Sequence, residues 1–112
     1  MKMDFKDYQE KSKKTDLRVV INDSKLAYYA LGLADESGEV AGKIKKLYRD
    51  YNGELTEEYK KEIAKEIGDV MWYMSQLCSN LGLTLEEVAE MNIEKLYNRM
   101  ERQKLKGNGD KR

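Results

Sequence analysis

Apolar residues recur every three or four positions along most of the chain, which predicts helices rather than strands. A short helix is predicted over residues 4–13, followed by a polar connection at residues 14–23. Three longer helices are predicted over residues 24–52, 56–81 and 84–104. The pattern therefore indicates an all-α protein.

The predicted ends of these helices carry residues that suit helix boundaries. Four residues with short polar side chains occupy the expected N-cap positions: Asp4, Ser24, Thr56 and Thr84. Thr84 and Glu87 form a capping-box pattern. Asn52-Gly53 and Gly82 are stop signals, because both residue types tolerate the left-handed backbone that ends many helices.

Each long helix has a stripe of apolar positions at helical spacing. In the second helix the stripe comprises Ala27, Ala30, Leu31, Ala34, Ala41, Ile44, Tyr48 and Tyr51. In the third it comprises Ile63, Ile67, Val70, Met71, Met74, Leu77, Cys78 and Leu81. Long amphipathic helices joined by short loops favour antiparallel neighbours. We therefore expect a small bundle of the four-helix type.

The length of 112 residues suits one domain, residues 1–112. Its helical core is expected at residues 24–104, and residues 105–112 are expected to be a mobile tail. One short and three long helices do not cover so wide an apolar arc. We therefore expect the core to be completed by a homo-oligomer, either a homodimer or a homotetramer.

Composition narrows the functional classes. The chain has 21 basic and 21 acidic residues, so no net charge favours nucleic acid or an anionic membrane. The absence of histidine excludes Ser-His-Asp and Cys-His nucleophiles and the usual zinc sites. With one cysteine, no apolar run of membrane-spanning length and no leader pattern, a cytoplasmic location is expected.

Two acidic motifs carry the candidate chemistry. Asp35, Glu36 and Glu39 lie in the second helix, and Glu66 and Asp69 lie in the third. Residues three apart share a helix face, so each motif can direct two carboxylates at one point. Hard cations such as Mg²⁺ prefer oxygen ligands of this kind.

The position of these acids strengthens a pattern that is weak alone. With 21 acidic residues, pairs at this spacing also arise by chance, and most charged helix faces are simply solvated. Glu66, however, falls between Val70 and Tyr73 on a helical wheel. Glu36, Glu39 and Lys43 form a stripe beside the apolar positions Leu33, Val40 and Leu47. Carboxylates beside packed surface repel one another and lose hydration, which a bound cation would relieve.

The fourth helix supplies the opposite charge. Asn92, Lys95, Arg99 and Arg102 recur at three- and four-residue spacing. Guanidinium groups bind phosphate through two parallel hydrogen bonds. The stripe therefore fits phosphates bridged to a cation, and it fits equally well a set of salt bridges to the acidic helices.

Residues 31–41 (LGLADESGEVA), 66–73 (EIGDVMWY) and 92–96 (NIEKL) together resemble the MazG-type nucleotide pyrophosphohydrolases of the all-α NTP pyrophosphohydrolase superfamily. The hallmark of that superfamily is Glu-x-x-Glu followed by Glu-x-x-Asp. The resemblance covers about residues 24–112. In this chain Glu36 and Glu39 match the first half, and Glu66 and Asp69 match the second.

The resemblance implies an activity and a site. It implies cleavage of nucleoside triphosphates between the α- and β-phosphates, with Mg²⁺, or Mn²⁺ in its place, held by the four matched acids. It implies a dimer or a dimer of dimers. Asp35 occupies the place of an additional acid, so Glu36, Glu39 and Asp35 are the catalytic candidates. The substrate-binding candidates are Asn92, Lys95, Arg99 and Lys43.

Two other classes remain open. A non-catalytic helical interaction module would leave the acids solvated and would not respond to Mg²⁺. A nucleic-acid-binding protein is disfavoured by the short basic stripe and the zero net charge. For the aromatic candidates, Trp72, Tyr73 and Tyr48, both base stacking and a place in the core are open.

Overall fold

The computed structural model describes residues 2–17 and 25–106. The described chain forms four helices and no strand: α1 (Phe5–Lys14), α2 (Lys25–Tyr51), α3 (Glu57–Asn80) and α4 (Leu85–Lys106). The all-α prediction is confirmed, and the predicted boundaries agree to within about two residues. Helix α4 ends at Lys106, two residues beyond the predicted helix end. The predicted cap at Ser24 and the rest of the tail lie outside the described residues.

Local hydrogen bonds explain where the helices begin. Asp4 caps α1, and Thr56 caps α3 by accepting the N–H of Tyr59 at 3.1 Å. At the start of α4, Thr84 accepts the N–H of Glu87 at 3.0 Å and donates its hydroxyl to the Glu87 carboxylate at 3.2 Å. These bonds satisfy N–H groups that have no partner within the helix.

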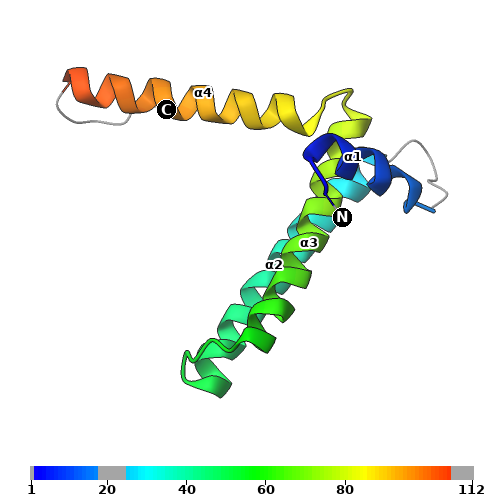
Figure 1. Ribbon diagram of the computed structural model, residues 1–112, viewed down its shortest axis with the longest axis vertical. Helices are drawn as coiled ribbons and strands as arrows, with labels where there is room; N and C mark the ends of the chain where they lie inside the picture. Colours follow the sequence, from blue (N-terminus) through cyan, green and yellow to red (C-terminus); the bar gives the residue numbers. More distant parts are fainter. Residues whose placement is uncertain (1, 18–24, 107–112) are drawn as a thin grey trace.

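Helices α2 and α3 form a long antiparallel hairpin (Figure 1). Their facing positions alternate in steps of four and three residues, the spacing of a two-helix seam. On α2 these positions are Tyr29, Leu33, Glu36, Val40, Lys43 and Leu47, and on α3 they are Tyr59, Ile63, Glu66, Val70, Tyr73 and Leu77. All are buried or half-buried. The pattern places two glutamates at seam positions that normally hold apolar side chains.

Two contacts fix the register of this hairpin. The Tyr59 hydroxyl donates to the backbone carbonyl of Lys43 at 2.6 Å. Nearer the other end, a methyl group in place of the Gly32 hydrogen would lie 2.1 Å from the Tyr73 ring, so only glycine allows this approach. In this register Glu36 lies opposite the turn of α3 that carries Glu66.

The apolar stripe expected to pack α2 lies instead on its exposed face. Leu31 is 72% exposed, Tyr48 68% and Tyr51 54%, and the alanines of that stripe are exposed too. The seam uses the neighbouring stripe, in which Tyr29 and Leu47 are buried. Among the described helices, only α3 packs extensively against α2, so this outer stripe stays exposed.

The expectation of antiparallel neighbours is wrong for α4. This helix leaves the end of α3 and points away from the hairpin, and its main contacts are with α1 (Figure 1). Gly82, with φ of +73°, ends α3 in a turn closed by the Leu83 N–H donating to the Cys78 carbonyl at 2.8 Å. The turn directs the chain outward, so the single chain is not a closed four-helix bundle.

Buried polar groups of α1 hold this junction together. The Gln9 amide donates to the Leu83 carbonyl at 2.9 Å and accepts the Leu85 N–H at 3.0 Å. The Ser12 hydroxyl lies 2.8 Å from that of Ser75 on α3. Because these groups are buried and paired, α1 fixes the direction in which α4 begins.

Among the described helices, none combines the length and the apolar character that crossing a membrane requires.

Candidate metal and nucleotide site

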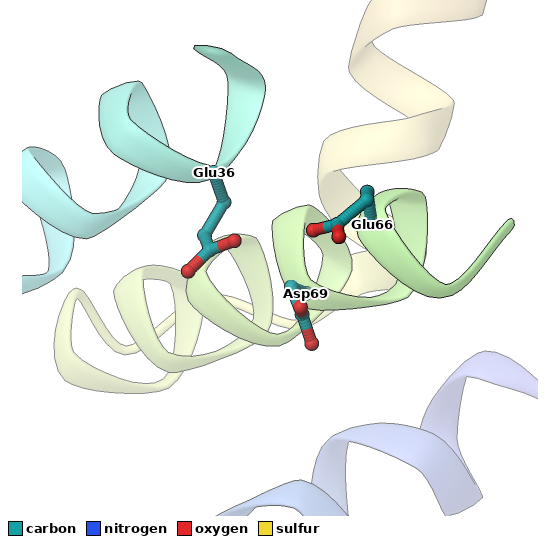
Figure 2. Close-up of side chains that lie close together, drawn as sticks. All are labelled: Glu36, Glu66 and Asp69. Atoms are coloured by element: carbon teal, nitrogen blue, oxygen red, sulfur yellow. The ribbon is translucent and has the colours of Figure 1, made fainter. Parts of the chain in front are cut away.

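Three carboxylates converge in the middle of the hairpin. Glu36 reaches across from α2, and Glu66 and Asp69 come from adjacent turns of α3 (Figure 2). One carboxylate oxygen from each residue lies within 4.8 Å of the other two. Glu36 and Glu66 are half-buried, whereas Asp69 is exposed. Oxygen atoms at this separation can contact one hard cation together, so the donor set fits a divalent metal ion.

The electrostatics of the cluster favour a positive charge at its centre. Burial raises the pKa of Glu36 above its ordinary value, and the negative charges of Asp69, Asp35, Glu66 and Glu39 raise it further. Of the ion pairs formed by residues 2–17 and 25–106, none joins these carboxylates to a lysine or arginine. A cation would remove this repulsion.

Replacing Glu36 with glutamine is expected to stabilise the metal-free protein, and increasingly so as the pH rises above 4.5, the ordinary pKa of this side chain. Because folding raises that pKa, the native state holds the proton more tightly than the unfolded chain. Wild-type stability therefore falls as the pH rises through the interval between the two pKa values, and the glutamine variant escapes that loss. Thermal melts in chelator between about pH 4 and 8 measure the difference in Tm. A difference that does not change with pH would contradict the assignment.

The remaining predicted acids lie beside the cluster. Glu39 and Asp35 are exposed on α2, and neither belongs to the converging group of the single chain. Glu39 is one turn beyond Glu36 and adds to its negative surroundings. Lys43 is half-buried at the seam, two turns from Glu36. The structure thus brings together three of the four predicted metal ligands.

The predicted substrate-binding residues of α4 are not brought to the cluster in one chain. Asn92 and Lys95 are exposed and Arg99 is half-buried, all on the helix that points away from the hairpin. The sequence places them correctly on one helix. Their distance from the acids follows from the outward turn at Gly82 and from the contacts of α4 with α1.

An aromatic recess of about 390 Å³ adjoins the carboxylates. It is lined by Glu36, Asp69, Trp72, Tyr73 and Thr15. The Trp72 indole N–H donates to the Thr15 hydroxyl at 2.7 Å, and the Trp72 and Tyr73 rings meet edge to face at 5.0 Å. A flat ligand attached to phosphates would find an aromatic wall beside the cation site.

Sequence reasoning missed the contribution of α1 to this site. Thr15 lines the recess. Burial of the Tyr8 hydroxyl raises its pKa, and the negative charge of Asp69 raises that pKa further, so Tyr8 lies near the cluster. Neither residue belongs to an acidic or basic motif. The only available signal was the amphipathic character of residues 4–13, which says that the helix packs but not where.

Comparison with known proteins shows the family of the chain. Residues 25–103 match the family model of the MazG nucleotide pyrophosphohydrolase domain, which spans α2, α3 and most of α4. The chain is also 42% identical over 87 residues to the Gene 37 protein of Mycobacterium phage L5, covering 78% of this chain and 76% of that protein. No solved structure matches the chain. The chain belongs to the MazG nucleotide pyrophosphohydrolase family.

Proposed function

We propose that this protein is a Mg²⁺-dependent nucleoside triphosphate pyrophosphohydrolase. It would hydrolyse an NTP or dNTP between the α- and β-phosphates to the monophosphate and pyrophosphate. The observation that carries the proposal is the convergence of Glu36, Glu66 and Asp69, whose carboxylate oxygens lie within 4.8 Å of one another inside the region that matches the family model. Mn²⁺ is expected to substitute, because it accepts the same oxygen ligands.

The acidic residues of α2 and α3 have different proposed roles. Glu36, Glu66 and Asp69 hold the cation, with Glu39 able to join them through a change of side-chain rotamer. When bound, Mg²⁺ would supply charge neutralisation for the triphosphate and a lowered pKa for water. The proposed role of Asp35, which is exposed beside Glu36, is to orient the attacking water and accept its proton.

The cationic residues of α4 are proposed to act in a second copy of the chain. Lys95 and Arg99 lie on a helix that projects from the hairpin of its own chain. The outer stripe of α2 carries exposed Leu31, Tyr48 and Tyr51 among alanines, and an added methyl at Gly38 would meet no atom within 4 Å. A homodimer, or a homotetramer built from it, would cover that face and bring α4 of one copy to the acids of the other. The two groups have opposite charge, so the fit is electrostatically favourable.

A nucleotide panel tests the function. Purified protein with Mg²⁺ is expected to release pyrophosphate from at least one common NTP or dNTP, and to lose that activity in chelator. Mg²⁺ plus a non-hydrolysable triphosphate analogue should also raise the Tm, because a ligand that binds only the native state stabilises it. Absence of both effects across the panel would favour the non-catalytic interaction module.

A further inference from the structure

The end of α1 meets the aromatic recess beside the carboxylates. Thr15 is the C-cap residue of α1, and it lines that recess together with Trp72 and the two acids Glu36 and Asp69. Trp72 follows Asp69 by three residues on α3, so the indole and the carboxylate share a helix face. Thr15 lies outside residues 25–103, the region that matches the family model, and its role has to be read from its own contacts.

The Thr15 hydroxyl makes two hydrogen bonds that fit each other. It donates its one proton to the Ser12 backbone carbonyl at 2.8 Å. Its oxygen accepts the Trp72 indole N–H at 2.7 Å. An indole N–H only donates, whereas a hydroxyl oxygen that has donated its proton can still accept, so both bonds form without conflict. Through this contact α1 holds an aromatic side chain of α3 in one orientation.

A buried pair of hydroxyls holds the same turn of α1 against α3. Ser12 and Ser75 are both buried, and their hydroxyl oxygens lie 2.8 Å apart. Ser75 follows Trp72 by three residues, so both side chains leave one face of α3 and contact the last turn of α1. Because the buried pair is satisfied only when this turn is in place, it fixes where the Thr15 oxygen meets the indole.

The recess can take the base of a nucleotide whose phosphates lie at the cation site. Its volume of about 390 Å³ falls within the range of roughly 300–1,000 Å³ typical of small-molecule sites. One part of its lining is acidic, from Glu36 and Asp69, and another is aromatic, from Trp72 and Tyr73. A divalent cation on the acids would attract phosphates, and every nucleobase has a flat face that stacks on an aromatic ring. One recess therefore offers contacts to both ends of the same substrate.

We propose that Trp72 stacks on the nucleobase of the substrate and that Thr15 is the positioning residue that holds the indole for this contact. This rests on the proposed function, because it takes the phosphates to lie at the carboxylate cluster. Thr15 acts through the indole and does not itself touch the substrate. Since any base can stack, the contact favours nucleotides over phosphates alone and discriminates only weakly between bases.

A double-mutant cycle separates positioning from a general effect on the fold. Thr15→Val removes the acceptor at nearly constant size, and we expect it to raise the KM for NTPs roughly fivefold. The kcat should stay unchanged, because a base contact is equally strong in the ground state and the transition state. Thr15→Ser keeps the hydroxyl and should restore the wild-type KM. Trp72→Phe keeps a ring but has no N–H, so in that background Thr15→Val should change the KM no further.

Inorganic tripolyphosphate, which has no base, is the control ligand for these variants. Its inhibition constant should be the same in wild type, Thr15→Val and Trp72→Phe. An unchanged KM in Thr15→Val, or an equal rise of the KM in both backgrounds, would overturn the positioning role. A parallel change in the tripolyphosphate constant would do the same, because it would place the effect at the phosphates.

A second readout needs no hydrolysis. The chain has one tryptophan, so the Trp72 indole N–H gives a single NMR signal. A non-hydrolysable analogue of at least one common NTP, added with Mg²⁺, should shift that signal further than Mg²⁺ with tripolyphosphate does, because a stacked base adds its ring current. Equal shifts would overturn the stacking contact even if NTPs are hydrolysed. A larger shift with the analogue, but no hydrolysis of any NTP, would support the base contact and defeat the pyrophosphohydrolase proposal.

Discussion

Asp69→Asn is expected to lower kcat/KM for nucleotide hydrolysis at least about a hundredfold while leaving the helical content unchanged. The exchange keeps the size of the side chain but removes one negative charge from the cluster of three carboxylates. Because Asp69 is exposed, the fold loses little packing. Steady-state kinetics over a range of Mg²⁺ concentrations, together with circular dichroism, measure the two effects separately.

The control for this variant is Asp50→Asn, an exposed aspartate of α2 whose partner is the adjacent Arg49 at 2.8 Å. Exposed pairs contribute little, so its activity and Tm should stay close to wild type. A partial rescue of Asp69→Asn by higher Mg²⁺ would identify the loss as one of cation binding. Full activity of Asp69→Asn at low Mg²⁺ would remove Asp69 from the site.

Combined replacement of Lys95 and Arg99 by alanine is expected to lower kcat/KM by a comparable factor, at least about a hundredfold. Both residues lie on α4, outside the cluster of their own chain. If Lys95 and Arg99 stabilise the departing pyrophosphate in a neighbouring copy, a mixed dimer of this double variant with Asp69→Asn should be active. Each inactive chain would supply what the other lacks.

Mixing the two inactive variants tests that arrangement. After equal amounts are unfolded together and refolded, half of randomly formed dimers are mixed, and each contains one intact site. The activity should therefore reach about a quarter of wild type. The unmixed variants, refolded in the same way, are the control and should stay inactive. No recovery, despite mixed dimers demonstrated by a tag on one chain, would mean that α4 does not act on the partner copy.

Much of the fold was predictable because it depends on local interactions. Helix starts at Asp4, Thr56 and Thr84 follow from side chains that bond to nearby N–H groups, and the stop at Gly82 follows from its left-handed backbone. The pairing of Glu36 with the acids of α3 was also predictable, since helix spacing and a short connection bring them together. These features need only a few neighbouring residues to specify them.

Long-range features were not predictable in the same way. α2 carries two apolar stripes, and periodicity alone does not say which faces α3. The outward course of α4 depends on hydrogen bonds from Gln9, 74 to 76 residues away in sequence.

The glutamates at the hairpin seam create a trade-off between the stability of the hairpin and its ability to bind a cation. Leucine at positions 36 and 66 would make the seam more apolar and the protein more stable, yet it would delete the ligands of the proposed ion. Selection for thermal stability alone would therefore favour stable but inactive variants of this chain. Retention of acid at these two positions is therefore a useful criterion for separating active relatives from degenerate ones.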